Sequence, residues 1–250
     1  MADSLILEGT CYVDRLTDAG VETGIVQFGN TVKLSIKPDA ERKQQMSKMK
    51  GKYGQVISSI SLPKPATFSM QVDQLQRDVF AMAFFGTDSD IDVTGSSVTD
   101  EVISEAPAGG RGFLVAQRQI SSVVVKDDSG TTTYVADTDY EVTSADLGLI
   151  TVIDGGAIVE DQILKVSYSY ASRAGYKVEG MTKVSVLVKI VLDGINLDNG
   201  NHCILTIDKG RLTPTAEIDF MSSEFFSATF DGDTETIEGA SSPFRVEYYA

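Results

Sequence analysis

The feature that most constrains the fold is a change of hydrophobic period at Asp73. Before it, in residues 66–72, apolar and polar side chains alternate with the period of two that a half-buried β-strand requires. After it, apolar residues recur at helical spacing as far as Gly86. The sequence therefore predicts a β-sheet against which one amphipathic helix packs. The predicted packing face of that helix consists of Leu75, Val79, Met82 and Ala83.

Two end signals bound the predicted helix at residues 73 and 86. Asp73 fits an N-cap, because its carboxylate can accept a hydrogen bond from a first-turn amide, and Gln76 stands where a capping-box partner reaches back. Gly86 lacks a β-carbon and can take the left-handed conformation that ends a helix.

The rest of the chain is predicted as strands, which places it in the mainly β class. Short strands separated by Gly/Asp turns fill the middle of the chain, a pattern typical of a small antiparallel sandwich. Longer alternating segments, including 31–37, 213–220 and 225–230, lie on both sides of that region. We therefore predict a split host domain, residues 1–96 and 176–250, around an inserted β-sandwich, residues 97–175.

Charge is distributed unevenly along this acidic chain. The whole sequence has 21 Lys and Arg against 36 Asp and Glu, yet residues 33–64 contain eight basic and two acidic residues. We predict that Pro38 ends a strand and that Lys37–Gly54 is a lysine-rich connection, helical in part around residues 41–50. The cations singled out as contacts between subunits are Lys37, Arg42, Lys43, Lys48, Lys50 and Lys52.

A basic loop on an acidic body can bind nucleic acid or dock on an acidic face of another copy of the chain. Nucleic-acid binding favours aromatic stacking platforms, and Tyr53 is the only aromatic residue in the loop. The sequence therefore favours docking between copies, with a solvated flexible loop as the alternative.

Several classes of protein receive no support from the sequence. The longest apolar run, 79–85, is far shorter than the ~20 residues of a membrane-spanning helix, and the N-terminus has no signal-peptide pattern, so we expect a cytoplasmic chain. Cys11 and Cys203 are too few for a disulfide framework, and their separation leaves open whether they pair; we expect buried free thiols.

The search for catalytic or metal-binding residues predicts none. His202 is the only histidine, and neither a catalytic triad nor a histidine metal site can be built on it. Asp88, Asp90 and Asp92 have the spacing of a calcium loop, but the glycine comes late, at Gly95, and the closing glutamate is absent. With no phosphate-binding glycine motif either, we expect neither an enzyme nor a cofactor.

The order of these segments resembles the major tail tube proteins of long-tailed bacteriophages. The resemblance lies in a basic loop between two strands, the segment Ser61-Leu62-Pro63-Lys64-Pro65, and Phe68-Ser69-Met70 leading into the helix. It continues late in the chain with Leu212-Thr213-Pro214-Thr215-Ala216 and residues 225–231, and it covers the host domain but not the insert.

The resemblance implies a barrel-forming β-sandwich with one helix on its flank. Six copies would close into a ring, and stacked rings would form the tube through which the genome leaves the virion. The partners implied are further copies of the chain and the tape measure, terminator and distal tail proteins, with assembly in the host cytoplasm. The basic loop would reach neighbouring subunits, and the insert would be an immunoglobulin-like decoration outside the tube.

A conduit for DNA should not bind DNA, and an acidic, hydroxyl-rich wall would repel phosphates. Two polar strand faces are candidates for lining the channel, although an ordinary solvated face explains them equally well. Their residues are Thr67, Ser69, Gln71, Thr215, Glu217 and Asp219. Two alternatives stay open: another ring-forming tail component, such as a terminator or distal adaptor, and a carbohydrate- or ligand-binding β-sandwich, which the absence of tryptophan disfavours.

Overall fold

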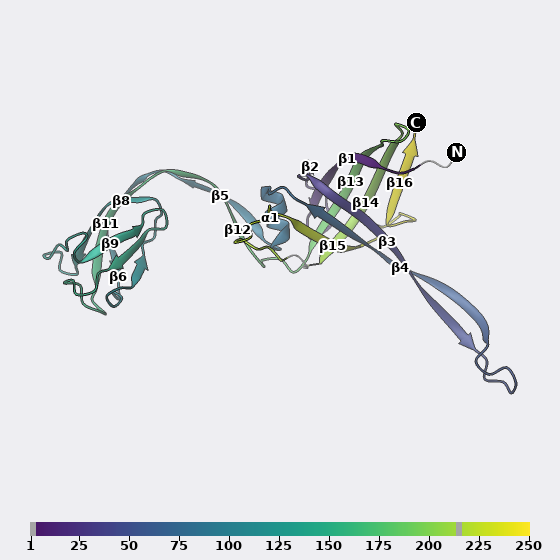
Figure 1. Ribbon diagram of the computed structural model, residues 1–250, viewed down its shortest axis with the longest axis horizontal. Coiled ribbons are helices and arrows are strands. Elements are labelled where there is room, and N and C mark those ends of the chain that lie inside the picture. Colours follow the sequence, from purple (N-terminus) through teal and green to yellow (C-terminus); the bar gives the residue numbers. More distant parts are fainter. Residues whose placement is uncertain (1–3, 214–216) are drawn as a thin grey trace. The chain divides into compact units, whose positions relative to one another are not determined.

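The computed structural model describes residues 4–213 and 217–250. The chain divides into two compact units: unit 1, Met1–Ser89 with Val178–Ala250, and unit 2, Asp90–Lys177. The described part is mainly β, with antiparallel pairing between strands and one α-helix (Figure 1). The mainly β class predicted from the sequence is confirmed. That unit 2 folds independently as an inserted domain stays a prediction.

Unit 1 is built on one eight-stranded antiparallel sheet in the order β2-β1-β13-β14-β15-β4-β3, with β16 pairing with β14 beside β15. Its strands are β1 (Leu7–Leu16), β2 (Ile25–Gln27), β3 (Thr31–Met46), β4 (Val56–Val72), β13 (Val186–Asn196), β14 (His202–Thr213), β15 (Ala228–Thr234) and β16 (Phe244–Tyr249). Along one edge, the long strand β14 pairs with two strands in succession. Residues 202–207 pair with β16, and residues 210–213 pair with β15.

The sheet of unit 1 curls back on itself. Strands β1 and β4 are four places apart in the order, which would separate them by about 19 Å in a flat sheet. Nevertheless, Cys11 Sγ on β1 lies 3.8 Å from Met70 Sδ on β4. The rings of Phe28 and Phe230 also meet across the interior, with centroids 5.7 Å apart. The buried core of unit 1 therefore lies inside the curve of its own sheet.

The helix α1 (Arg77–Ala83) is shorter than predicted. Its N-cap is Gln76, without a side-chain cap, whereas Asp73 lies directly after β4 and donates its backbone N–H to the Asn30 carbonyl. The Gln76 side chain instead accepts a hydrogen bond from the Gly29 amide at 3.1 Å. The N-cap and capping-box predictions were therefore wrong, because these residues tie the helix approach to the turn between β2 and β3.

The end of α1 also differs from the prediction, because Phe85 and not Gly86 takes the left-handed conformation, with φ 50°. The amide of Phe85 bonds the carbonyl of Met82, and the amide of Gly86 bonds the carbonyl of Ala81, which together form a Schellman motif. Gly86 is needed for a different reason: a β-carbon there would lie 2.7 Å from the Glu179 carbonyl oxygen.

Of the predicted packing face, Val79 and Met82 are buried in the core of unit 1, and Ala83 packs partly buried against it. Leu75 was wrongly assigned to this face: it precedes the helix and is 49% exposed. Because the helix begins only at Arg77, Leu75 lies outside it and is not on the helical face that buries Val79.

The predicted loop at 37–54 is mostly strand. Strand β3 continues through Pro38 to Met46, with a register shift between Lys37 and Asp39 that accommodates the proline, and β4 runs back from Val56. Only residues 47–55 form the turn, and they are not helical. This prediction was wrong because every residue from 37 to 46 is exposed, so neither face carries the apolar alternation that identifies a strand.

Unit 2 contains two three-stranded antiparallel sheets, β6-β11-β8 and β7-β10-β9. Their strands are β6 (Ser96–Ile103), β7 (Gly112–Leu114), β8 (Ile120–Asp127), β9 (Tyr140–Ser144), β10 (Leu149–Val152) and β11 (Leu164–Tyr170). Side chains from both sheets, including Val125, Ile150 and Val166, form one buried cluster. Residues 131–135 form no strand, and Thr133 makes an isolated bridge with Lys126.

The chain leaves and re-enters unit 1 through a two-stranded ribbon, β5 (Thr87–Val93) with β12 (Arg173–Glu179). Asp88, in β5, lies within contact distance of two arginine side chains, Arg77 and, at 3.6 Å, Arg15. The carboxylate is thus engaged by cations of its own unit.

Candidate functional site

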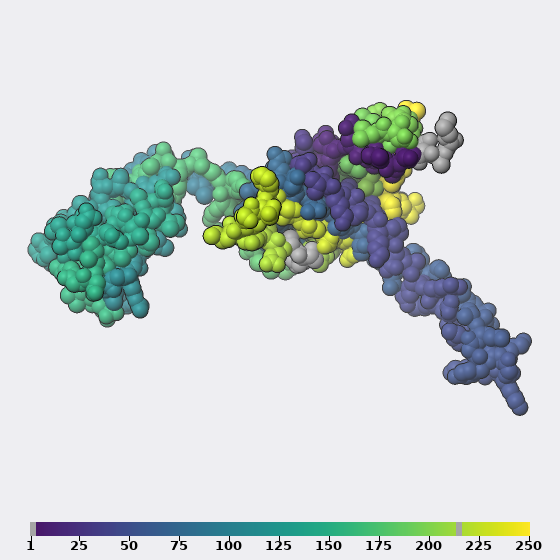
Figure 2. All heavy atoms as spheres, in the orientation of Figure 1, coloured from purple at the N-terminus to yellow at the C-terminus, as the bar shows by residue number. Residues whose placement is uncertain are grey.

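The long hairpin of β3 and β4 has an inner and an outer part. In the inner part, residues 31–37 pair with 67–72, and β15 pairs with the other edge of β4. In the outer part, from the pair Asp39–Lys64 to the pair Met46–Val56, each strand pairs, among the described residues, only with the other. Figures 1 and 2 show this outer part as a narrow arm of unit 1. At ~3.3 Å per residue it extends roughly 25 Å beyond the sheet.

The turn at the end of the arm is ordered by backbone hydrogen bonds. The Ser47 amide donates to the Gln55 carbonyl at 2.7 Å, and the Gly54 amide donates to the Ser47 carbonyl at 2.9 Å. Gly51 and Gly54 both have φ of 81°, a region that side-chain-bearing residues rarely adopt. The turn therefore holds Lys48, Lys50 and Lys52 together at the end of the arm.

The predicted inter-subunit cations all lie exposed on this hairpin. Lys37, Arg42 and Lys43 are on β3, and the other three are in the terminal turn. Arg42 donates to the Ser59 hydroxyl on β4 at 2.7 Å. Among the described residues, no ion pair involves Lys48, Lys50 or Lys52, so their charge is available to another molecule.

The arm also exposes large apolar side chains that were not among the predicted site residues. They are exposed by 41–60% on β4 and by up to 80% in the turn: Val56, Ile57, Ile60, Leu62, Met49 and Tyr53. Large apolar residues gathered on one projecting element are typical of an interaction surface. The spacing of these apolar residues could have identified an exposed surface in the sequence. It does so only once the structure shows that residues 56–65 have β3 beside them and, among the described residues, no strand on their other edge.

The polar candidates on β4 share the outer face of the sheet. Cross-strand pairing sets Thr67 beside Asp233 and Lys37, and Ser69 beside Asp231 and Ser35. Gln71 donates from Nε2 to Ser227 Oγ at 2.9 Å. A shallow hollow of about 390 Å³ lies on this face. The face presents hydroxyl and amide groups on β4, with carboxylates on β15 and ammonium groups on β3.

The second set of polar candidates does not form a strand face. Thr215 lies outside the described residues, and Glu217 and Asp219 are exposed in an irregular loop after β14. The prediction that residues 213–220 form a strand was wrong beyond residue 216. Polar/apolar alternation over so few residues does not distinguish a strand from a loop that happens to alternate.

Side chains with catalytic potential are held in structural contacts. His202 stacks on Tyr249 across the β14–β16 ladder, with ring centroids 5.3 Å apart. Cys11 and Cys203 are buried free thiols, and burial raises the pKa of Cys11 to about 11. Within the described ranges, no group of three or more His, Cys, Asp or Glu is placed to hold a metal ion. No helix there is long and apolar enough to cross a bilayer.

Comparison with known proteins identifies a family but no activity. No curated protein matches the sequence. The profile of the family described as "Protein of unknown function UCP028589" matches residues 4–236, which include all of unit 2 and most of unit 1. The chain therefore belongs to this family.

Proposed function

We propose that this protein is the subunit of a bacteriophage tail tube, as its resemblance to the major tail tube proteins implies. Copies close into six-membered rings, the rings stack, and the genome passes through the resulting tube. The observation that carries the proposal is the outer part of the β3–β4 hairpin. Among the described residues its two strands pair only with each other, and it carries exposed cations and apolar side chains suited to an acidic neighbour.

The sheet of unit 1 supports the same function through its edges. Strands β2 and β3 end the strand order, and within the described residues β16 pairs only with β14. Exposed strand edges promote association with other chains. Pairing between neighbouring copies would cover them and close the curled sheets into a continuous barrel.

The outer face of β4 supports a channel that does not retain DNA. Thr67, Ser69 and Gln71 carry no charge, and the next strand contributes Asp231 and Asp233. Neutral and acidic groups give phosphates no strong attachment. The lysines at 33 and 37 lie on β3, the end strand of the sheet, where a neighbouring copy would contact them in the proposed ring. In this proposal unit 2, with its two small sheets, is an immunoglobulin-like decoration outside the tube.

Reversing charge at the end of the arm tests this function. Purified protein should form rings or tubes, observed by negative-stain microscopy and light scattering. The Lys48→Glu, Lys50→Glu, Lys52→Glu triple variant should remain a folded monomer, because its arm would repel an acidic neighbour. A matched control, Arg111→Glu, Arg118→Glu, Lys126→Glu in unit 2, makes the same change in net charge and should still assemble. Persistent monomers of the unaltered protein at high concentration would refute the proposal.

A further inference from the structure

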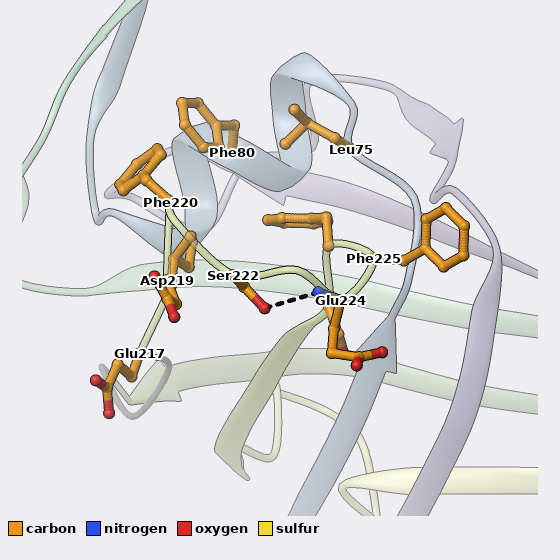
Figure 3. Close-up of a pocket in the computed structure, with 11 residues that line it drawn as sticks. Leu75, Phe80, Glu217, Asp219, Phe220, Ser222, Glu224 and Phe225 are labelled. Carbon is orange, nitrogen blue, oxygen red and sulfur yellow. Dashed lines mark hydrogen bonds between the residues drawn. The ribbon is translucent and has the colours of Figure 1, made fainter.

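An apolar hollow on unit 1 is not filled by any described residue of its own chain. It measures about 450 Å³ and lies between Leu75 on the approach to α1, Phe80 within α1, and the loop of residues 217–227 (Figure 3). Phe220 closes one end of it: its ring stacks on Phe84 at 5.9 Å and meets Phe80 edge-on at 6.1 Å. The loop is thus anchored to the helix by aromatic contacts.

Large apolar side chains around this hollow face solvent. Phe220 is 70% exposed, Met221 92% and Phe225 97%. The loop is nevertheless ordered by local hydrogen bonds, from the Met221 amide to Asp219 Oδ1 at 2.8 Å and from the Glu224 amide to Ser222 Oγ at 3.0 Å. An ordered loop that exposes this much apolar surface is typical of an interaction site.

The rim of the hollow is acidic. Glu217, Asp219 and Glu224 line it and are exposed, and none of the residues that line it is basic. Its occupant should therefore combine apolar side chains with positive charge. Within the described chain, the outer part of the hairpin has this combination, with Ile57 and Ile60 behind the three lysines of its turn.

The hairpin cannot reach the hollow of its own chain. The hollow adjoins the Val72 end of β4, since Leu75 lines it, whereas the basic turn adjoins the Val56 end. These ends are 16 residues apart on one paired strand, which is roughly 50 Å at ~3.3 Å per residue. A contact between the two surfaces must therefore join two copies.

We propose that the acidic apolar hollow receives residues 46–62 of a second copy, which comprise the turn of the arm and the adjoining end of its outer part. This inference rests on the proposed self-assembly and names the surface that accepts the arm. The lysines of the turn lie against Glu217, Asp219 and Glu224, while Ile57 and Ile60 cover the exposed phenylalanine rings. Because donor and acceptor are different surfaces, the contact is heterologous, and its repetition closes a ring or extends a fibre.

Site-directed disulfide formation tests the contact directly. Full-length Ile57→Cys and Phe225→Cys variants are mixed under mild oxidation, and the peptide linking positions 57 and 225 is quantified by mass spectrometry. We expect it to be at least tenfold more abundant than the corresponding link when Val184→Cys, at a fully exposed position elsewhere in unit 1, replaces Phe225→Cys. Equal yields in the two mixtures would overturn the proposal. The native cysteines are buried and should not compete.

Charge exchange separates this inference from the proposed function. Glu217→Lys, Asp219→Lys, Glu224→Lys should abolish assembly as the triple lysine reversal does, and a chain carrying both sets of substitutions should assemble again. The unaltered protein could form tubes while the 57–225 link is absent and the chain with both sets of substitutions does not assemble. This result would reject the hollow as acceptor but not the tube function. A specific link between copies that never form rings or tubes would retain the acceptor and reject the tube.

Discussion

The inner and outer parts of the β3–β4 hairpin share two strands and one antiparallel ladder but differ in burial. In the inner part, alternate residues of β4 are almost completely buried, with Phe68, Met70 and Val72 exposed by 2% or less. In the outer part, every residue from 56 to 65 is exposed. The difference lies in the third element, because β15 and the curled sheet cover only the inner part. Backbone pairing alone therefore does not determine which residues form a core.

In an isolated chain, the outer part of the hairpin has little to stabilise it beyond its own two strands. A two-stranded ribbon is at best marginally stable in water, and three strands or a covering element are needed for independent stability. The outer part should therefore be held in place largely by continuation of the inner ladder. In the proposed tube, the neighbouring copy supplies the missing third element.

The largest difference should follow from truncating one apolar residue in each part. Phe68→Ala empties a buried site and should lower the free energy of unfolding by about 3–5 kcal/mol. Ile60→Ala should change it by no more than ~0.5 kcal/mol in the monomer, since Ile60 is 60% exposed. Urea unfolding monitored by circular dichroism compares the two. A similar cost for both would show that the arm packs on its own chain.

Glycine substitutions should give a smaller contrast, between β15 beside the inner part and the turn at the end of the arm. Gly232 pairs with Phe68, and a β-carbon there would lie 2.5 Å from the Arg211 carbonyl and 2.7 Å from the Phe68 ring. Gly232→Ala should therefore cost about 1–3 kcal/mol through overpacking. Gly51→Ala meets no atom within 4 Å, so it should cost only about 1 kcal/mol for its left-handed backbone. Thermal unfolding of both variants measures the difference, and an equally mild Gly232→Ala would contradict the tight inner packing.

The smallest contrast concerns two acidic residues. Glu235, just after β15, accepts hydrogen bonds from Lys209 at 2.7 Å and Arg211 at 2.6 Å, and these hold the pKa of Glu235 below its usual 4.5. On the arm, Asp39 contacts Lys64 only at 4.0 Å, with both side chains about half exposed. Because the Glu235 site is 30% exposed, Glu235→Gln should cost only about 0.5–1 kcal/mol at pH 7. Asp39→Asn should cost nothing measurable.

Lowering the pH should remove the stabilisation that the Glu235 carboxylate provides. A carboxylate with a lowered folded pKa stabilises the fold fully above its unfolded pKa, and this stabilisation is lost as the pH falls through the folded value. The difference between the parent protein and Glu235→Gln should therefore be constant above about pH 5 and vanish below it as Glu235 is protonated, in urea unfolding measured at several pH values. A difference that persists unchanged at pH 2 would show that the substitution acts through packing.

The sequence predicts elements well where one face is buried and poorly where neither is. Alternation in residues 66–72 correctly indicates a half-buried strand, and Val79 and Met82 lie in the core as their helical spacing suggests. The same criterion fails for residues 38–46, where an extended strand has two exposed faces and therefore no hydrophobic period. It also fails at Leu75, where a helix that starts late leaves an apolar residue outside the buried stripe.

By itself, the sequence determined the mainly β class, the single helix, the basic segment at residues 33–64 and the absence of a recognisable catalytic motif, because these depend on residue type and local period. The tertiary structure alone decided that the basic segment is a paired arm, that Phe85 ends the helix, and that residues 217–227 form an acidic apolar hollow beside α1. These features depend on which distant strand lies alongside each segment, and no local pattern of side chains records that.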